Sequence, residues 1–519
     1  MKVVLCAPRA VSPAGVMPRL HPPTGLLFTA GQIRAEGHTV AVLDSAVLPL
    51  VGVGVGEHQL PIETQRLGED DYWKVGARPD QVALQLAANP PDVVGIACAT
   101  VADRGEARCL AQAVRSVLPD VPIILGGHEA GFWAEEILAS DAARPEAIPA
   151  VDYVVVGASQ PSIGELLTNI GRGELHRPVA GVADREHPSS WTQMPQPFDP
   201  NSCALPAYDL LPSVWTAHGF AKDLYSALSH PHAGDLAALG VAAAGSYFPL
   251  HTSFGCGFNC SFCDTPRALV RYSASNVGRM INAFSSIFPV AYIDILDNNF
   301  GGGGRESRAI AFEILDLLAE LGTPIGFSNG LTFESMSRDK FALLDRFAQM
   351  ETVRHIAFPC ENGNDRVLSM IHKPHNLALV MRVLHRAREL LPDTNREGFF
   401  IGGFPETSGK PAESPDEVAQ TVEFVRRLLS EDLLDQAIFL TMSPVTKDYR
   451  SAWRKLAPTA PFEACLFSEA TSVWPYPRRY LDEAREAVKR ANDDHGSPVT
   501  RRFTYKDFRE ANVLPVVLG

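Results

Sequence analysis

Three cysteines crowd into eight residues of this 519-residue chain, with three and then two residues between them: Cys256, Cys260 and Cys263. The chain has nine cysteines, so composition alone predicts roughly 0.003 such matches, and chance does not explain the spacing. Structural zinc usually takes four ligands in two separated pairs, and no second pair follows at finger-like spacing. Three thiolates suit an iron–sulfur cube that leaves one iron open to an outside ligand. The loop therefore predicts metal-centred redox chemistry.

The elements that must position this loop form the second half of the chain. From His251 onward, short strand-like runs alternate with helical stretches, as in the units of a parallel α/β barrel. One strand is expected before the cysteine loop. Five more are expected at 291–296, 325–328, 355–358, 398–401 and 437–440. Six such units make an open, partial barrel rather than a closed eightfold one. The segments after the strands should surround the cysteine loop, because the carboxyl ends of barrel strands meet at one face.

These motifs resemble the radical S-adenosylmethionine (SAM) superfamily, in which an aromatic residue commonly precedes the third cysteine, as Phe262 does here. Segments 297–300, 328–331, 361–363, 398–406 and 441–444 resemble those that follow successive strands in this family. One of them departs from the pattern, because relatives more often have Glu-Ser-Gly where this chain has Glu361-Asn362-Gly363. The resemblance implies that the three cysteines are catalytic and hold a 4Fe-4S cluster, and that a flavodoxin or ferredoxin reduces it. It also implies SAM contacts at Phe262, Asn299, Asn329, Glu361, Gly402 and Thr441.

The first half of the chain reads as a second α/β unit. Short β-branched runs alternate with amphipathic stretches, which is typical of βα units that build a parallel sheet. We expect strands at 2–6, 39–43, 93–97, 122–125 and 153–156, and helices at 25–36, 105–117 and 130–138. This pattern predicts a Rossmann-like, doubly wound domain. Such domains bind ligands beyond the carboxyl ends of their strands.

The opening of this half, 21–27 and 37–44, resembles the cobalamin-binding domain carried by one large radical SAM class. The resemblance implies cobalamin contacts at Thr24, Gly25, Ala99, Thr100, Gly126, Gly127, His128, Gly157 and Ser159. The Asp-x-His-x-x-Gly motif that supplies a cobalt ligand in methionine synthase is absent, and its nearest imitation is 493–496. The resemblance thus implies a cobalt without a histidine ligand from that loop. Two alternatives stay open: a domain that binds another ligand, and one that only acts as a scaffold.

The two halves and their flanks predict four parts in an α/β protein. The cobalamin-binding, Rossmann-like domain is expected at 1–185, followed by a connecting segment with some helix at 186–248. The partial (β/α)6 radical SAM barrel is expected at 249–445 and a small mixed segment at 446–519. For several residues just after the cysteine loop or in the last segment, two interpretations stay open: they line or cap a substrate pocket, or they only pack at the surface or in the core. These residues are Arg271, Tyr272, Trp453, Trp474, Tyr476, Arg478 and Arg479.

Composition narrows the possible partners. The formal net charge of −14 disfavours nucleic acid, since its binders normally present a basic face. No apolar run is long enough to cross a bilayer and the start has no cleavable-signal layout, so we expect a cytoplasmic protein. As a separate expectation, the protein is a monomer. Cysteines in that compartment rarely form disulfides. We expect the other six to be mostly buried small hydrophobic residues: Cys6, Cys98, Cys109, Cys203, Cys360 and Cys465.

The combined resemblance implies a cobalamin-dependent radical SAM methyltransferase that methylates an unactivated carbon of a small molecule in natural-product biosynthesis. Methylcobalamin would carry the methyl group, and a 5′-deoxyadenosyl radical would abstract hydrogen from the substrate. A relative that catalyses cyclisation or rearrangement without methyl transfer is the first alternative. A methylthiotransferase would need three further cysteines in the first domain, and Cys6, Cys98 and Cys109 are placed unlike that pattern. A cobalamin carrier or sensor would not need the cysteine loop. The substrate itself is not predicted.

Overall fold

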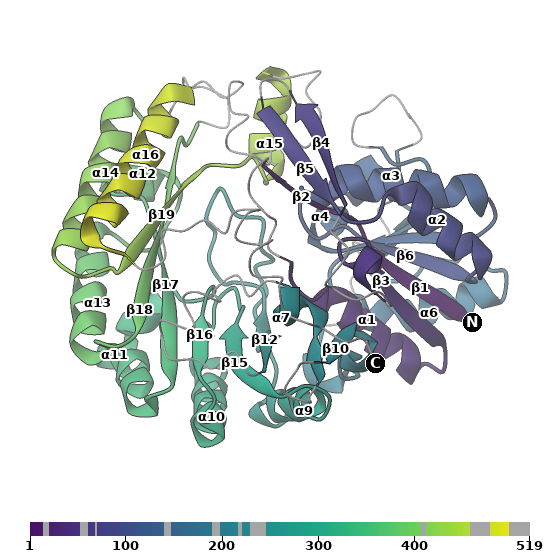
Figure 1. Cartoon of the computed structure of the whole chain (residues 1–519), viewed down its shortest axis with the longest axis horizontal. Helices are drawn as coiled ribbons and strands as arrows, with labels where there is room; N and C mark the ends of the chain where they lie inside the picture. The colour runs from purple at the N-terminus through teal and green to yellow at the C-terminus, as the bar shows by residue number, and fades with distance from the viewer. Residues whose placement is uncertain are drawn as a thin grey trace.

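The computed structural model describes residues 1–13, 20–51, 61–67, 70–139, 147–188, 198–215, 221–228, 245–405, 412–456 and 478–497. Glu406, Cys465, Trp474 and Tyr476, which the sequence singled out, lie outside these ranges. Two α/β domains lie side by side, and helix α15 (Lys447–Leu456) lies between them (Figure 1). None of the described helices is long and apolar enough to cross a membrane.

The first domain is built on a six-stranded sheet in the order β3-β1-β6-β7-β8-β9. The first five of these strands are parallel and β9 is antiparallel to β8. All five predicted strands are confirmed within two residues at each end. The strands are β1 (Lys2–Ala7), β3 (Thr39–Asp44), β6 (Val93–Ala97), β7 (Ile123–Gly126), β8 (Tyr153–Val155) and β9 (Val182–Asp184).

Helices cover both faces of this sheet, as the doubly wound prediction requires. One buried cluster joins α1 and α6 to the sheet, and another joins α2 and α3 to it from the other face. The helices are α1 (Thr24–Ala35), α2 (Pro79–Ala88), α3 (Asp103–Val117), α4 (His128–Phe132), α5 (Ala134–Ile137) and α6 (Gln160–Gly171). The single helix expected at 130–138 is wrong, because Trp133 leaves the helical conformation (φ −116°, ψ 24°) and divides it into α4 and α5.

Apart from a strand pair beside the cysteine loop, two small sheets of the described residues were not predicted from the sequence. An antiparallel sheet of β2 (Ala10–Pro13), β4 (Ile62–Leu67) and β5 (Asp70–Val75) rises from the first domain toward α15 (Figure 1). In the connecting segment, β10 (Ser213–Trp215) pairs with β11 (Ala221–Asp223), and α7 (Leu224–Leu228) follows. These strands were missed because polar residues interrupt their apolar alternation, so their periodicity is weak.

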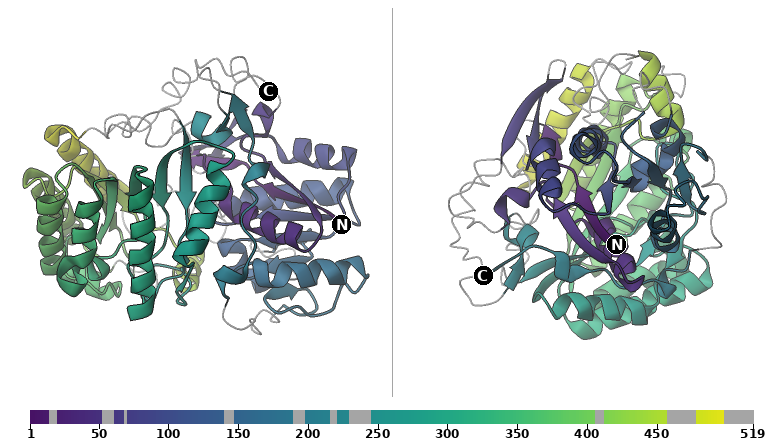
Figure 2. Two further views of the ribbon diagram at one scale, coloured as in Figure 1. Left: turned by 90° about the horizontal axis from the view of Figure 1, so that it is seen from below. Right: turned by 90° about the vertical axis from the view of Figure 1, so that its right-hand side faces the viewer.

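The second domain is the predicted open barrel of six parallel strands, in the order β12-β15-β16-β17-β18-β19. The strands are β12 (Ser246–Leu250), β15 (Val290–Ile295), β16 (Ile325–Phe327), β17 (Val353–Glu361), β18 (Asn395–Gly402) and β19 (Gln436–Thr441). Helices lie along its outer side (Figures 1 and 2). They are α9 (Ala274–Ser285), α10 (Arg305–Leu321), α11 (Phe333–Met350), α13 (Leu377–Leu390) and α14 (Pro415–Ser430). The short α12 (Asp365–Met370) packs instead in an apolar cluster with residues of both domains. Order and direction of the strands confirm the partial (β/α)6 prediction.

The last described helix, α16 (Arg478–His495), completes the barrel wall instead of forming a separate unit. Its Leu481, Ala484 and Val488 belong to the buried core of the barrel. The Asn492 amide is bonded to the backbone nitrogen and oxygen of Ala437 in β19, at 2.9 and 2.8 Å. Of the described C-terminal helices, α16 therefore packs on the barrel, whereas α15 contacts the first domain.

The remaining cysteines are mostly buried, as expected. Cys6, Cys98 and Cys360 are buried, and Cys203 is half-buried. The expectation is wrong for Cys109, which is exposed because it lies on the solvent side of α3, whose other face packs on the sheet.

An ion pair joins α12 to α14 at the carboxyl ends of the barrel strands. The Arg366 guanidinium donates to both carboxylate oxygens of Glu417, at 2.5 and 2.7 Å, and Ser414 completes a capping box with the same carboxylate. The Arg366 guanidinium holds the pKa of Glu417 down to about 2. Because this folded-state pKa lies below the ordinary value of 4.5, the stabilisation is complete above pH 4.5 and is lost as the pH falls toward 2.

We therefore expect Glu417→Gln to lower the free energy of unfolding by about 1 kcal/mol at pH 7, because glutamine keeps the cap and removes the charge. Urea unfolding at pH 7 and pH 3 measures it, and the difference from the unmodified chain should shrink at the lower pH. Glu423→Gln, which breaks the exposed pair with Arg426 on the same helix, is the control and should cost less. An equal effect of the two variants at both pH values would contradict the prediction.

Candidate functional site

The three cysteines lie on a loop between β13 (Ser253–Phe254) and β14 (Val270–Arg271), directly after the first barrel strand. The Cys263 backbone nitrogen donates to the Cys260 carbonyl at 3.3 Å. The Arg267 guanidinium donates to the carbonyls of Phe258, Cys260 and Cys263, the last two at 3.4 and 3.3 Å. A single side chain thus holds three carbonyl groups of the loop that carries the thiols.

The start of the loop is tied to the end of the second barrel strand. The buried Asp297 carboxylate accepts hydrogen bonds from the backbone nitrogens and the hydroxyls of Thr252 and Ser253, at 2.5 to 3.1 Å. Arg271 lies 3.5 Å from the same carboxylate. At Gly255, with φ +83°, an added Cβ would lie 1.9 Å from the carbonyl oxygen of Ala268, so the turn before Cys256 requires glycine. These contacts make the loop a preorganised structure.

The thiols have polar neighbours but no disulfide partners. The Asn299 amide nitrogen lies 3.7 Å from the Cys256 sulfur, and the Cys263 sulfur lies 3.2 Å from the Thr265 hydroxyl. Burial raises the pKa of the Cys260 thiol, which Lys373 partly offsets. In the described part of the chain, no three His, Cys, Asp or Glu side chains converge as the ligands of one metal ion would. In a 4Fe-4S cube, each of the three thiolates would bind its own iron.

A buried ion pair at the end of β17 faces the same loop. The Lys373 ammonium lies 2.7 Å from the Glu361 carboxylate and 5.5 Å from the centre of the Phe262 ring. Burial lowers the pKa of Lys373, but the Glu361 carboxylate and the thiols of the loop outweigh it and raise that pKa. Glu361 has φ +62°, a strained conformation for a non-glycine residue that is characteristic of functional positions. Of the expected SAM residues, Phe262 and Glu361 are thus brought together.

Lys373 was not predicted. It stands in a turn, twelve residues after Glu361, and no motif or periodicity distinguishes it from other lysines. Only the fold brings it to the cysteine loop.

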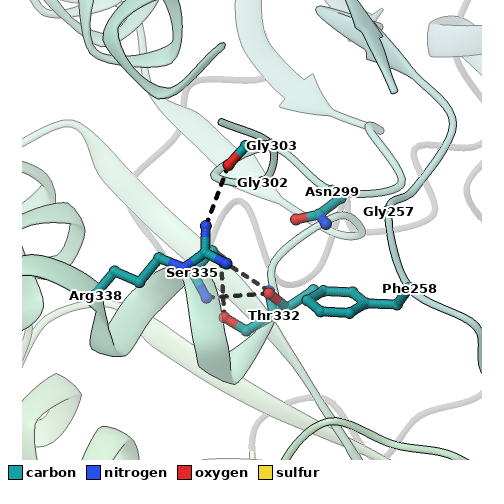
Figure 3. A pocket seen from close by; sticks show the side chains of 8 residues that line it. All are labelled: Gly257, Phe258, Asn299, Gly302, Gly303, Thr332, Ser335 and Arg338. Carbon is teal, nitrogen blue, oxygen red and sulfur yellow. Dashed lines mark hydrogen bonds between the residues drawn. The ribbon is translucent and has the colours of Figure 1, made fainter. Parts of the chain in front are cut away.

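A pocket of about 180 Å³ opens beside Cys256. The walls come from the cysteine loop, the segment after β15 and the start of α11, and the lining residues are Gly257, Phe258, Asn299, Gly302, Gly303, Thr332, Ser335 and Arg338. Figure 3 shows the Arg338 guanidinium reaching across to the Gly303 carbonyl, 3.3 Å away. Arg338 ends the first part of α11, before three residues with positive φ. The pocket offers hydroxyl, amide and guanidinium groups to a small polar ligand.

The other expected SAM residues differ in their surroundings. Asn299 lines the pocket, whereas Asn329 is exposed at the next strand end. Gly402 pairs with Thr441 across β18 and β19, and an added Cβ at Gly402 would lie 2.4 Å from the Phe439 ring. The Thr441 hydroxyl is already engaged by Arg485 of α16, at 3.0 Å.

The nine residues expected to contact cobalamin end or follow strands at the carboxyl edge of the first sheet, or start α1. The Asp103 carboxylate accepts from the backbone nitrogens of Ala99 and Thr100, at 3.0 and 2.8 Å, and holds that turn. The Ser159 hydroxyl is bonded to Thr29 of α1 at 2.7 Å, so two of the expected segments are joined.

The backbone at this edge is open enough for a large flat ligand. An added Cβ at Gly25 or Gly126 would meet no atom within 4 Å, and Ala99, Thr100 and Gly157 are exposed. Gly127, with φ +117°, packs so tightly on the β6 turn that a Cβ would lie 2.5 Å from the Cys98 carbonyl oxygen. Small residues thus leave the carboxyl edge of the sheet accessible, while the turn at Gly127 beneath it is closely packed. This arrangement fits a corrin or its nucleotide tail.

The two sites face each other across a contact that the sequence did not predict. His128 Nε2 of the first domain lies 3.1 Å from the Asp264 carboxylate, and Asp264 directly follows Cys263. Next to it, Glu129 is buried between Arg104 and Arg450 of α15, at 2.9 and 2.6 Å. An apolar cluster continues this interface from both domains: Tyr72, Val101, Val367, Leu368, Ile371, Phe404, Met442, Tyr449 and Trp453, with Phe262 packed against it. Trp453 therefore packs in the interface core.

Comparison with known families assigns both domains. Residues 14–167 match the model of the B12 binding domain, and residues 250–425 match that of the radical SAM superfamily. The chain is a radical SAM protein with an amino-terminal B12-binding domain. The two matches coincide with the sheet edge around Gly126 and with the barrel that carries the cysteines, so the predicted family and fold are confirmed.

Two curated relatives of this radical SAM protein are methyltransferases by name. An uncharacterized methyltransferase of Pyrococcus horikoshii is 24% identical over 82% of this chain and 78% of its own length. The cytidylyl-2-hydroxyethylphosphonate methyltransferase of Streptomyces wedmorensis is 24% identical over 86% of this chain and 80% of its own length.

Two solved structures share the fold across both domains. The radical SAM methyltransferase TsrM of Kitasatospora setae, solved with cobalamin and a [4Fe-4S] cluster, matches with a TM-score of 0.55 at 15% identity, over 88% of this chain and 75% of TsrM. The cobalamin-dependent radical SAM enzyme OxsB, solved with aqua-cobalamin and SAM, matches with a TM-score of 0.56 at 14% identity, over 94% of this chain and 57% of OxsB. The cofactors in these two structures are the set expected from the sequence.

Proposed function

We propose that this protein is a cobalamin-dependent radical SAM methyltransferase that methylates an unactivated carbon of a small natural-product molecule. The observation that carries the proposal is the apposition of the two sites: the cysteine loop of the barrel contacts the open edge of the B12-binding domain through Asp264 and His128, 3.1 Å apart. The methyltransferase names of both curated relatives and of TsrM support the reaction class. A substrate between the domains would meet both cofactors.

Different residues of the two domains have different roles in this reaction. Cys256, Cys260 and Cys263 would hold the cluster, and Arg267 with Asp297 keeps their loop in place. When bound, the cluster supplies electrons and an open iron for the cleavage of SAM, and cobalamin carries the methyl group. The apolar cluster around Tyr449 and Trp453 closes one side of the interface and keeps water from it.

We further propose that the pocket beside Cys256 receives the methionine end of SAM. The Asn299 amide and the Ser335 hydroxyl suit an ammonium or carboxylate group, and the Arg338 guanidinium suits the carboxylate. Glu361, held by Lys373 next to Phe262, would accept a hydrogen bond from a ribose hydroxyl of SAM. We also propose that a flavodoxin or ferredoxin donates electrons to the cluster, and that the protein is a monomer in the cytoplasm.

Arg338→Met is expected to raise the Kd for SAM about tenfold, because one charge-assisted hydrogen bond to the carboxylate is lost. Equilibrium dialysis of the cluster-loaded protein without reductant measures this binding. Arg305→Met is the matched control, an exposed arginine two residues beyond Gly303 that does not line the pocket. Unchanged SAM affinity of the Arg338 variant would remove this residue from the SAM site.

Two measurements test the function as a whole. Anaerobically purified protein from cobalamin-supplied cells should contain about four irons and one cobalamin per chain. With SAM labelled on its methyl carbon and a library of candidate substrates, the label should appear in the product. Iron without cobalamin, even after reconstitution, would withdraw the methyltransferase proposal. Product formed without label would instead assign cyclisation or rearrangement.

A further inference from the structure

The turn between β7 and α4 is held from two directions. Gly126, Gly127 and His128 of this turn belong to the expected cobalamin site. His128 also contacts the cysteine loop of the barrel, and the next residue, Glu129, contacts Arg450 of α15. Consecutive residues of one turn therefore serve a ligand site in one domain and an interface with the other.

The first contact leads to the cysteine loop. His128 Nε2 and the Asp264 carboxylate are 3.1 Å apart, with the two side chains 38% and 21% exposed. Pairing with Asp264 raises the pKa of His128, so the charged form of the imidazole is favoured. Since Asp264 is joined to Cys263 by a single peptide bond, any change in the placement of Cys263 moves the carboxylate that His128 meets.

The second contact makes the turn stiff. Glu129, 2% exposed, accepts from Arg104 of its own domain and from both terminal nitrogens of Arg450, at 2.6 and 3.1 Å. The Glu129 and Ala130 backbone nitrogens donate to the Ala99 and Cys98 carbonyls, at 3.3 and 3.1 Å. Displacement at His128 therefore reaches the second expected cobalamin segment, Ala99 and Thr100, as well as Gly126 and Gly127.

We propose that His128 and Asp264 are a positioning pair that couples the cluster site to the cobalamin site, so that a loaded cluster tightens cobalamin binding. The inference rests on the proposed function, because it needs both cofactors. Three thiolates bound to one rigid cube fix the loop from Cys256 to Cys263 and so fix Asp264. Asp264 then holds the turn in its binding conformation before cobalamin arrives, which removes part of the ordering cost.

Linkage makes the size of this coupling measurable. If cluster loading shifts the cobalamin affinity by some factor, cobalamin shifts the cluster affinity by the same factor, and typical couplings are about 5-fold to 150-fold. One ion pair with partly exposed side chains belongs at the lower end, so we expect about fivefold to tenfold.

The experiment compares the Kd of hydroxocobalamin for the full-length protein without cluster and after cluster reconstitution, by anaerobic absorption titration. His128→Gln and Asp264→Asn each remove the ion pair from one side. His187→Gln is the matched control, because His187 also lies close to a carboxylate, 3.2 Å from Asp184 in the first domain. Asp184 lies in β9 and pairs with Tyr153 at the start of β8, so this contact is at the edge of the sheet opposite to the carboxyl edge. Thermal melting of each variant checks that the fold is kept.

The unmodified protein and His187→Gln should bind hydroxocobalamin about fivefold to tenfold more tightly after cluster loading. In His128→Gln and in Asp264→Asn, the ratio of the Kd of hydroxocobalamin without cluster to the Kd with cluster should be near one. The double variant should give the same ratio as either single variant. Equal affinities of the unmodified protein with and without cluster would overturn the inference while leaving the proposed function standing. A ratio that survives in His128→Gln would overturn it as well. No hydroxocobalamin binding in either form of the unmodified protein would defeat both proposals.

Discussion

Replacing Cys260 by serine is expected to remove most of the iron from the reconstituted protein and to reduce SAM cleavage to background. The loop supplies three thiolates and Arg267 orders the carbonyls around them, so the loss of one thiolate leaves a cube with two bound corners. Cys260 is the most buried of the three cysteines. Iron analysis, the absorption spectrum and 5′-deoxyadenosine formation with dithionite as reductant measure the effect.

The matched control is Cys109→Ser, an exposed cysteine on α3 of the first domain. It should keep the iron content and SAM cleavage of the unmodified chain. Serine at Cys256 or Cys263 should reproduce the result at Cys260, because each thiolate binds a different iron. Full iron content and turnover in any of the three serine variants would refute the cluster assignment.

Arg450→Met is expected to destabilise the protein by about 3 kcal/mol, because it leaves the buried Glu129 with one cationic partner in place of two. The guanidinium also lies 4.4 Å from the centre of the Trp133 ring and donates to the Pro444 carbonyl at 3.2 Å. Urea unfolding followed by tryptophan fluorescence measures the free energy, and Trp133 itself reports on the interface.

Lys447→Met provides the comparison, since Lys447 contacts Glu136 across the same interface at 3.5 Å and its side chain is 48% exposed. It should cost less than about 1 kcal/mol. The double variant Glu129→Gln with Arg450→Met should be less destabilised than the sum of the single variants, because both remove one interaction. Additive effects, or equal effects of Arg450→Met and Lys447→Met, would show that the buried ion triad does not hold the domains together.

The hierarchy of these interactions assigns different roles to neighbouring residues. Glu129 contributes mainly stability, because it and its partners are almost fully buried. His128 contributes little to stability, because its pair with Asp264 is partly exposed, and its proposed role is to transmit the state of one loop to another. Variants of the two residues should therefore separate in the unfolding and cobalamin-binding measurements.

Much of the fold and the centre of the site could be predicted from local patterns. The five parallel strands of the first domain and the six of the barrel are short β-branched runs separated by helical periodicity, and both signals are carried by neighbouring residues. The three cysteines lie within eight residues, so their spacing survives in the sequence as a motif. The small sheet of β2, β4 and β5 was missed because its strands are too polar for this signal.

By itself, the sequence determined the cysteine loop, the two α/β domains in their order and the family to which they belong, since each of these depends on residues close along the chain. The tertiary structure alone decided that Lys373 pairs with Glu361 beside Phe262, and that His128 meets Asp264. Glu129 and Arg450 are 321 residues apart, and no motif near either residue predicts that they pair. Charged side chains can pair with any opposite charge, so only the docking of two folded domains, driven by their apolar interface, selects which ones meet.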